Sequence, residues 1–375
     1  MLQIDHLKHV HKFFRYVGYY GLVRTLFKAY GRSESLLLFI VLRLFVFIVG
    51  STLNRNRSSK IGLIGCGQYG FSTIGYFLVR QGYVITHVYD VDKTQCRKFE
   101  RIFKSRILMP HQMVDCDRIY IASNHASHAV YASNFVLSNK WVHIEKPIAV
   151  DYESLSMLEP FIGTFNGSVG YNRPHSRYTR NVLKILKKNL PISLSFNVVG
   201  HNLRPDHWYN NPNEGTRLLG NFSHWIDLTL FLFNHINDRS SLSLCLSLLD
   251  DGVIDDNILV DIKSELGSRS TILFQTRSEP ILGIQESHFY QQEGETIFIR
   301  DYRSIEIISE KYSKRIRTRK DVGHLDMLKI GRSNHSDFER AIETTKLTLA
   351  IIDGLRSGAE KISFKRYATN HTKFK

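Results

Sequence analysis

The stretch IGLIGCGQYG, residues 61–70, decides how the rest of the chain is interpreted. It begins as a short apolar run, typical of a buried parallel strand, and breaks into G-x-G-x-x-G at Gly65, Gly67 and Gly70. An apolar pattern with helical spacing follows over residues 71–78. In such a strand–turn–helix unit, the first glycine permits the turn, the second lets a pyrophosphate approach the backbone, and the third lets the helix pack on the strand. The N–H groups and positive dipole end of the helix would then face the phosphates.

A second apolar run, residues 83–89, ends at Asp90, twenty residues after Gly70. A carboxylate at this spacing can accept hydrogen bonds from both ribose hydroxyls of an adenosine and would repel the 2′-phosphate of NADP. The residues that follow, Val91 and Asp92, include no arginine that could bind that phosphate. The sequence therefore predicts NAD rather than NADP. The structural alternative is an ordinary βαβ unit with an exposed aspartate.

Length, cysteine content and charge narrow the class of protein. The 375 residues suffice for two domains, and the hydrophobic fraction of 43% can supply their cores. The 4 cysteines form no C-x-x-C pair, which argues against a disulfide framework or a metal site and favours a reducing compartment. The net charge of +15 indicates an anionic partner, such as a nucleotide, a phosphorylated sugar or a membrane surface. Nucleic acid is excluded as that partner because no zinc finger, RNP-like motif or basic stripe with interleaved aromatics occurs.

Residues 1–57 form an extension with its own character. Residues 1–60 hold ten Lys and Arg against two acids, and residues 1–34 are amphipathic at helical spacing. Residues 36–50 are almost uninterruptedly apolar apart from Arg43, but this run is short for a bilayer span and its central charge would be costly there. A cleavable signal peptide is also disfavoured. Two interpretations stay open: a helical arm packed on the body or on a second subunit, and a monotopic anchor that binds anionic lipids.

Polar residues follow two further predicted strands. Residues 118–122 form a buried strand that ends in Ser123-Asn124-His125-Ala126-Ser127-His128, and residues 141–144 form another that ends in Glu145-Lys146-Pro147. Ligands of doubly wound sheets bind at the carboxyl ends of such strands. An ammonium at Lys146 could donate to a substrate oxygen, hold it in register for hydride transfer and stabilise a developing alkoxide. Most lysines at strand–loop junctions are, however, only surface residues.

The ordered set of IGLIGCGQYG, YDVD, IASNHASHAVYASNFVLSNKWVHIEKP and VGYNRPHS resembles the Gfo/Idh/MocA family of oxidoreductases. The resemblance runs from about residue 60 to about residue 364. It implies a Rossmann domain, an EKP tripeptide whose Lys-Pro bond is often cis, and a second α/β domain with an open sheet that serves oligomerisation. Asn172 and Arg173 match the family's GxNRR stretch only in part, because Pro174 replaces the second arginine; Arg173 would face the substrate or form a structural ion pair.

A second group of candidate residues lies in EGTRLLGNFSHWID, residues 214–227, which resembles the family's glycine-rich helix start and H-x-x-D. On a helix His224 and Asp227 share a face, so the carboxylate could orient the imidazole, and His224 would act as general base. The structural alternative is a buried histidine. Many relatives carry an aspartate where this chain has Gly220, and Asn221 cannot transfer protons in its place. This difference from the family leaves open the alternative that the protein binds a sugar without turning it over.

From residue 242 the pattern changes to strands, expected at 242–249, 258–266, 271–276, 287–292, 296–300 and 304–308. We also expect helices at 152–161, 176–190 and 337–357, the last with core-like apolar spacing. The basic run of residues 311–320 is most simply a solvated edge strand, and a site for a phosphate-bearing substrate is the alternative.

The sequence thus predicts an α/β protein in three parts: a helical extension (1–57), a Rossmann domain with a doubly wound parallel sheet (58–170), and a substrate and oligomerisation domain with a large, mostly antiparallel sheet (171–375). The predicted function is NAD-dependent hydride transfer at a hydroxyl of a sugar, polyol or sugar nucleotide, in surface-polysaccharide precursor metabolism. The alternatives are a glycosidase that acts by transient oxidation and a non-catalytic regulator. We expect a cytoplasmic homo-oligomer, with peripheral contact of residues 1–57 with the inner face of the membrane as a hypothesis, and no metal. The predicted catalytic residues are Lys146, His224 and Asp227; the cofactor contacts are Gly65, Gly67, Gln68, Tyr69, Gly70, Asp90, Ser123, Asn124, His125, His128, Glu145 and Lys146; the substrate contacts are Asn172, Arg173, Trp208 and Asn221.

Overall fold

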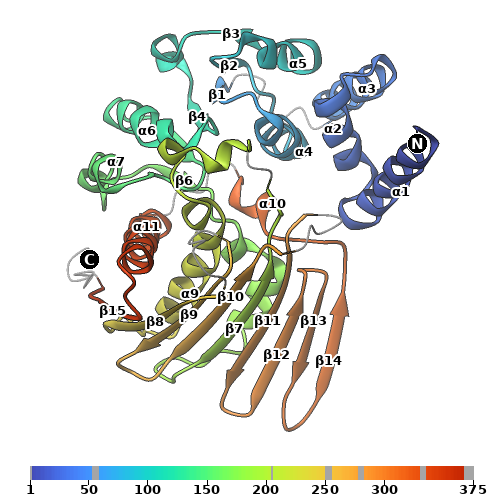
Figure 1. The fold of residues 1–375 in the computed structure, drawn as a ribbon. Coiled ribbons are helices and arrows are strands. Elements are labelled where there is room, and N and C mark those ends of the chain that lie inside the picture. The colour runs from blue at the N-terminus through green and yellow to red at the C-terminus, as the bar shows by residue number, and fades with distance from the viewer. Residues whose placement is uncertain are drawn as a thin grey trace. The chain divides into compact units, whose positions relative to one another are not determined.

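The computed structural model describes residues 2–52, 59–203, 206–249, 256–277, 283–329 and 335–366 (Figure 1). The chain divides into two compact units. Unit 1 comprises residues 1–175, 213–215 and 323–339, and unit 2 comprises residues 176–212, 216–322 and 340–375. These units differ from the three consecutive parts expected from the sequence, because two short later segments return to unit 1 and the N-terminal extension packs within it.

Unit 1 is built on a six-stranded sheet in the order β3-β2-β1-β4-β5-β6, in which every neighbouring pair is parallel. This is the predicted doubly wound arrangement, in which the strand order reverses between the neighbouring strands β1 and β4. The predicted strand at residues 83–89 is shorter, and the edge strand β3 was not predicted. Two residues are too few to show an alternating pattern. The strands are β1 (Ile61–Ile64), β2 (His87–Tyr89), β3 (Arg106–Ile107), β4 (Arg118–Ile121), β5 (Trp141–Ile144) and β6 (Gly167–Val169).

Helices flank this sheet (Figure 1). The helix after the glycine turn starts as a π-helix, η1 (Gly70–Gly75), and continues as α4 (Tyr76–Arg80). The others are α5 (Lys93–Phe103), α6 (His128–Leu137), α7 (Tyr152–Ser156) and α10 (His324–Met327). The helix expected over 152–161 is wrong in length, because α7 is followed by a separate 3-10 turn, Glu159–Phe161, that has a proline at its start.

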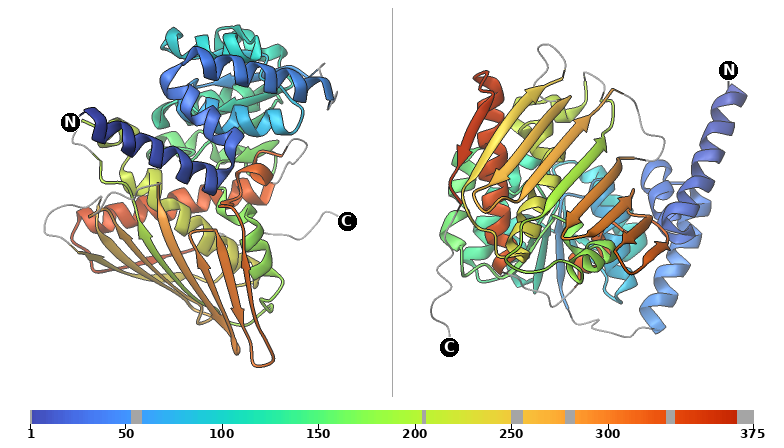
Figure 2. Two further views of the ribbon diagram at one scale, coloured as in Figure 1. Left: turned by 90° about the vertical axis from the view of Figure 1, so that its right-hand side faces the viewer. Right: turned by 90° about the horizontal axis from the view of Figure 1, so that it is seen from below.

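The extension forms three helices, α1 (Leu2–Tyr20), α2 (Leu22–Ser33) and α3 (Leu36–Thr52). Figures 1 and 2 show them in dark blue beside the α4 and α5 region. Phe27 and Tyr30 of α2 and Leu42 and Val46 of α3 are buried in the same hydrophobic cluster as the apolar residues of η1, α4 and α5. The extension is therefore an integral layer of unit 1. No helix among the described residues is both long and apolar enough to span a bilayer.

Unit 2 is built on a nine-stranded sheet in the order β14-β13-β12-β11-β7-β10-β9-β8-β15. Only the β7–β10 pair is parallel, as predicted for a mostly antiparallel sheet. The strands are β7 (Ser193–Val199), β8 (Leu242–Leu248), β9 (Ile258–Ser264), β10 (Arg269–Gln275), β11 (Gln285–Gln292), β12 (Glu295–Arg300), β13 (Ser304–Ile308), β14 (Ser313–Arg317) and β15 (Lys361–Phe364).

Helices α9 (Ser223–His235) and α11 (His335–Arg356) lie against one face of this sheet (Figure 2). The helix expected over 176–190 is shorter, α8 (Arg177–Leu183). The basic run at 311–320 contains β14, an edge strand, which confirms the simpler interpretation of that run. On the sheet face away from the helices, β7 exposes Ser193, Ser195 and Asn197. These three positions of β7 are polar, and the use of this face for oligomerisation stays a prediction.

Candidate cofactor and catalytic site

The glycine turn has the geometry that a dinucleotide requires. Gly65 has φ +95, and a Cβ there would lie 2.2 Å from the carbonyl oxygen of Ala122. A Cβ on Gly70 would lie 2.4 Å from the carbonyl oxygen of Gly65, so the helix start passes close to the strand end. At Gly67, by contrast, a Cβ would meet nothing within 4 Å. The first and third glycines therefore satisfy packing within the protein, and the second leaves space beside the backbone for a pyrophosphate.

The carboxylate of Asp90 is held in place by the same turn. The backbone N–H of Cys66 donates to Oδ2 at 2.7 Å, and the N–H of Asp92 donates to Oδ1 at 2.9 Å. The residue is half-buried, at the end of β2. Each carboxylate oxygen keeps further lone-pair capacity, so ribose hydroxyls can donate to a group that is already oriented.

The loop after β4 is tied down by Glu214, whose role the sequence did not reveal. The Glu214 carboxylate accepts from the side-chain amide of Asn124 at 2.8 Å and from the N–H of Ala126 at 3.2 Å. The Nδ1–H of His125 donates to the Glu214 carbonyl at 3.1 Å. Burial lowers the pKa of His125 to about 2, so this imidazole is neutral. Ser123 joins the loop through a hydroxyl contact of 2.7 Å with Ser127.

His128 lies at the start of α6 and is buried. Its two ring nitrogens face the carbonyl oxygens of Pro147, at 2.7 Å, and Ser123, at 3.1 Å. The ring therefore connects the end of β4 to the turn after β5. Its direct contact with a cofactor stays a prediction.

Glu145 and Lys146 follow β5, and the bond between Lys146 and Pro147 is cis. One oxygen of the buried Glu145 carboxylate lies 3.0 Å from Nε2 of His143, whose Nδ1 contacts the Ser168 hydroxyl at 2.8 Å. His143 precedes Glu145 by two residues, so both side chains emerge on one face of the strand. That alternation is the signal that could have identified His143 from the sequence.

Lys146 lies in a partly buried position at this strand end. Burial lowers its pKa to about 8; the Glu145 carboxylate opposes this effect and the Arg173 guanidinium adds to it. Tyr69 of the glycine turn also reaches Glu145: burial, followed by the charge of that carboxylate and a hydrogen bond to it, raises the pKa of the phenol well above its ordinary range. The turn after β1, the end of β5 and Arg173 thus form one electrostatic cluster in unit 1.

Other predicted residues of unit 1 lie nearby. Asn172 and Arg173 are buried after β6. Gln68 turns away from the strand ends toward the extension, because its side-chain amide donates to the Lys28 carbonyl at 3.0 Å. A backbone contribution of Gln68 to cofactor binding remains a prediction.

In unit 2, His224 occupies the first turn of α9, and its side chain is buried. Asp227, three residues later, is fully buried and accepts a hydrogen bond of 2.8 Å from Nε of Arg340 in α11. The sequence predicts that this carboxylate orients His224, which stays a prediction, and the structure shows in addition its ion pair with Arg340. This buried ion pair joins α9 to α11, and a catalytic part for Asp227 stays a prediction. Arg340 lies more than a hundred residues away, so no local spacing indicated it.

The remaining predicted residues of unit 2 lie before and within the π-helix η8 (Leu218–Phe222). The hydroxyl of Tyr209 donates to the side-chain oxygen of Asn221 at 3.4 Å. Trp208 packs against Tyr209 with its ring tilted by 30° and the ring centroids 4.3 Å apart, and it is 46% exposed. An exposed aromatic beside an amide is suited to contact a sugar ring.

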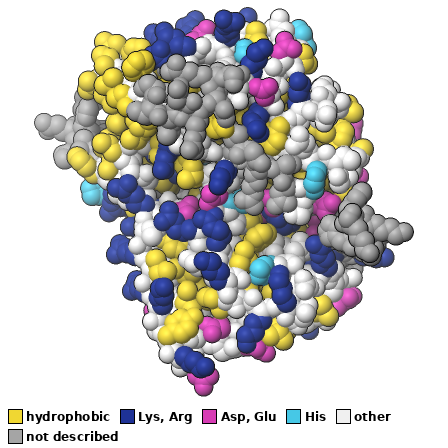
Figure 3. All heavy atoms as spheres, turned by 180° about the vertical axis from the view of Figure 1, so that it is seen from behind, with side chains coloured by type: hydrophobic (Ala, Val, Ile, Leu, Met, Phe, Trp, Pro, Cys, Tyr) yellow, Lys and Arg dark blue, Asp and Glu magenta, His cyan; other side chains and the backbone are white. Residues whose placement is uncertain are grey.

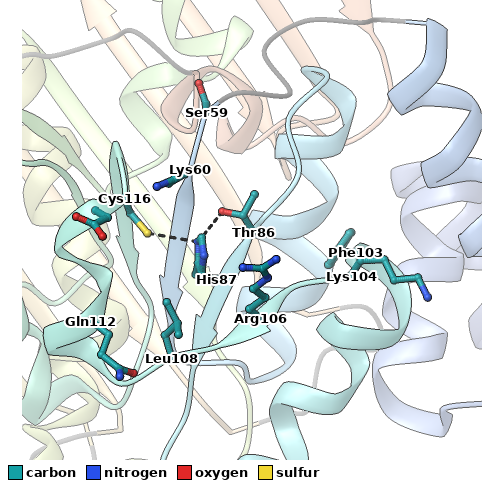
Figure 4. A pocket seen from close by; sticks show the side chains of 11 residues that line it. Ser59, Lys60, Thr86, His87, Phe103, Lys104, Arg106, Leu108, Gln112 and Cys116 are labelled. Carbon is teal, nitrogen blue, oxygen red and sulfur yellow. Dashed lines mark hydrogen bonds between the residues drawn. The ribbon is translucent and has the colours of Figure 1, made fainter.

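A cavity of about 460 Å³ lies at the amino ends of the strands of the first sheet (Figure 4). Lys60 precedes β1 and Thr86 precedes β2, so this cavity is at the amino ends of the strands, away from the glycine turn. Cationic side chains of Lys60, Lys104 and Arg106 line it. It is no part of the predicted cofactor site.

Comparisons with known proteins agree with this geometry. Residues 59–159 match the Gfo/Idh/MocA model, described as an oxidoreductase family with an NAD-binding Rossmann fold. Over these residues the chain is similar to that family. The match confirms the predicted Rossmann domain, the nicotinamide cofactor class and the oxidoreductase class. No curated protein matches the chain.

Solved structures share the fold over most of the chain. The UDP-N-acetylglucosamine 3-dehydrogenase GnnA from Acidithiobacillus ferrooxidans has a TM-score of 0.65 at 12% identity, covering 80% of this chain and 97% of its own. The WlbA dehydrogenase from Bordetella pertussis, solved with NADH and UDP-GlcNAcA, has a TM-score of 0.62 at 16% identity, covering 83% and 99%. A putative myo-inositol dehydrogenase from Sinorhizobium meliloti 1021 has a TM-score of 0.62 at 17% identity, covering 82% and 100%. At these identities the similarity shows the fold alone.

Proposed function

We propose that this protein transfers a hydride between NAD and a hydroxyl-bearing carbon of a sugar, polyol or sugar nucleotide, with a sugar nucleotide as the preferred substrate. The observation that carries the proposal is the cluster around Lys146, at the end of β5 in a domain whose glycine turn leaves room for a dinucleotide. Of the proteins with a similar fold, GnnA is a UDP-N-acetylglucosamine 3-dehydrogenase and WlbA was solved with UDP-GlcNAcA, which supports the substrate class. The net charge of +15 suits a diphosphate-bearing substrate.

Lys146 performs the polar part of this reaction. When NAD is bound, its nicotinamide supplies the hydride acceptor. The Lys146 ammonium donates to the substrate oxygen, fixes that oxygen relative to the cofactor and stabilises the charge that develops as the hydride leaves. Glu145, positioned by His143, keeps an anion next to the ammonium and favours its charged form despite burial.

His224 of unit 2 accepts the hydroxyl proton in this proposal, because a neutral imidazole is a suitable general base near neutral pH. Asp227 contributes indirectly, by joining α9 to α11 through Arg340. With Gly220 in place of the aspartate that many relatives carry, His224 takes the whole of the proton-transfer task.

The test begins with the cofactor. Purified protein is denatured and the released small molecules are identified by mass, with NAD the expected one. The protein is then incubated with NAD and a panel of UDP-sugars, free sugars and polyols while NADH absorbance is recorded. NADH formation with a UDP-sugar and none with the corresponding free sugar supports the proposal. Retention of NAD with no turnover on any member refutes it in favour of the non-catalytic regulator that Gly220 keeps in consideration.

We further propose that the enzyme works in the cytoplasm on precursors of surface polysaccharides, as a homo-oligomer that pairs through the open sheet. The support is the fold and the reducing compartment that the cysteine pattern favours. Light scattering on the purified protein tests the oligomer, and a monomer at micromolar concentration would contradict it. Release of sugar from an aryl glycoside without net NADH would instead identify the glycosidase alternative.

A further inference from the structure

The outward face of α3 exposes a group of large apolar side chains. Seven large apolar side chains on this helix are between 40% and 74% exposed. At 3.6 residues per turn they fall within an arc of about 140°. They are Leu36, Leu37, Ile40, Val41, Leu44, Phe47 and Ile48. Figure 3 shows hydrophobic side chains gathered over the region of the extension. An apolar patch of this kind marks an interaction site.

The opposite face of α3 is already occupied. Leu42 and Val46 are buried in the hydrophobic cluster of unit 1. Nη1 of Arg43 donates to the Ile102 carbonyl in the last turn of α5 at 2.6 Å, where a cation meets the negative end of the helix dipole. The Arg43 charge, which made a bilayer span costly, is therefore directed toward α5 and away from the outward face. Over residues 36–49, whose exposure the structure describes, the outward face presents apolar side chains.

The neighbouring helix α5 adds positive charge. Four exposed cationic residues form a basic stripe that falls within an arc of about 80° at helical spacing. They are Lys93, Arg97, Arg101 and the adjoining Lys104. Arg101 lies 3.7 Å from Glu34, two residues before the start of the apolar face, so this basic stripe borders it. Lys104 also lines the cavity with Lys60 and Arg106, which continues the cationic surface to the sheet edge (Figure 4).

We infer that the outward face of α3 docks on an anionic membrane surface, with the basic stripe of α5 facing the lipid headgroups. Apolar burial combined with attraction to anionic lipid is how monotopic helices bind, and α3 suits a position in the interface plane. Its 17 residues extend about 25 Å, less than the hydrocarbon thickness of about 30 Å. If two copies of the chain paired through this face, their basic stripes would come together. The repulsion between the stripes disfavours a second copy as the partner.

The experiment is cosedimentation of the full-length protein with vesicles of phosphatidylcholine alone and of phosphatidylcholine mixed with phosphatidylglycerol, at low and high salt. We expect binding to the mixed vesicles that weakens with salt, because counterions screen the basic stripe. The variant Leu37→Glu/Ile40→Glu/Phe47→Glu places three carboxylates on the apolar face and should weaken binding at least tenfold. The matched control Val91→Glu/Leu137→Glu/Leu266→Glu makes the same change in charge at exposed apolar residues outside the extension and should bind nearly as well as the wild type.

A further variant, Arg97→Gln/Arg101→Gln/Lys104→Gln, should remove most of the salt dependence and leave residual binding. Thermal unfolding confirms that each variant is folded. Wild-type protein that stays in the supernatant with every vesicle overturns the inference. So does a dimer, measured by light scattering, that the α3 variant dissociates while vesicle binding is unchanged. Equal losses in the α3 variant and its charge-matched control would also overturn it, since charge alone would then explain the binding.

Discussion

Two regions of unit 1 reverse the usual relation between polarity and burial. At the strand ends, Glu145, Arg173, His125 and His128 are charged or polar and buried, whereas on the outward face of α3 large apolar residues are exposed. Buried polar groups and exposed apolar patches are the informative exceptions to the general burial rule. At the strand ends the polar atoms are held by specific hydrogen bonds, which indicates a rigid site for chemistry. On α3 a broad face is presented, which indicates adhesion rather than recognition of one small ligand.

The largest expected effect comes from breaking the strand-end cluster. Lys146→Ala should lower kcat by roughly 10²–10⁴-fold, because it removes the donor to the reacting oxygen. NADH formation with the UDP-sugar substrate measures this. Lys60→Ala is the matched control, since Lys60 lies at the amino ends of the strands of the same sheet and Lys146 lies at their carboxyl ends. Full activity of the Lys146 variant would remove this mechanism.

The pH profile sharpens the same assignment. Burial lowers the Lys146 pKa to about 8, and the protonated form is the proposed donor, so kcat/KM should fall as pH rises above about 8. Lys146→Arg keeps a cation that does not titrate in this range and should lose the alkaline limb, at a lower overall rate. A profile that rises through pH 8 and is lost in the arginine variant would instead make neutral Lys146 the base.

The strand-end region was largely predictable because each of its residues has a local signature. Glycine spacing, an acid at a fixed distance and EKP after an apolar run can each be recognised from a short stretch of the sequence. What the sequence could not show depends on contacts between distant segments. Glu214 holds the loop after β4, about ninety residues earlier in the chain, and Arg340 takes the carboxylate of Asp227. The inward direction of Arg43 likewise depends on the position of α5, which periodicity alone does not give.

A smaller effect is expected at the adenosine end of the site. Asp90→Asn removes the charge that repels a 2′-phosphate, so NAD affinity should fall roughly tenfold, about the worth of one charge-assisted hydrogen bond, while affinity for NADP rises relative to it. Titration with both cofactors by calorimetry measures the ratio. Asp92→Asn is the control, because Asp92 caps α5, an N-cap position where asparagine serves as well. An unchanged ratio in the Asp90 variant would place the ribose elsewhere.

The smallest effect concerns how α3 is held. Arg43→Met keeps the length of the side chain but removes the hydrogen bond to the Ile102 carbonyl, so the free energy of unfolding should fall by about 1–2 kcal/mol. Urea unfolding measures it, with Arg32→Met, an exposed residue of α2, as the control expected within about 0.5 kcal/mol of the wild type. Because Arg43 faces inward, vesicle binding by the folded Arg43 variant should be preserved. A variant that is stable but no longer binds vesicles would mean that Arg43 contacts lipid, and the distinction between an anchored inner face and an adhesive outer face of α3 would be wrong.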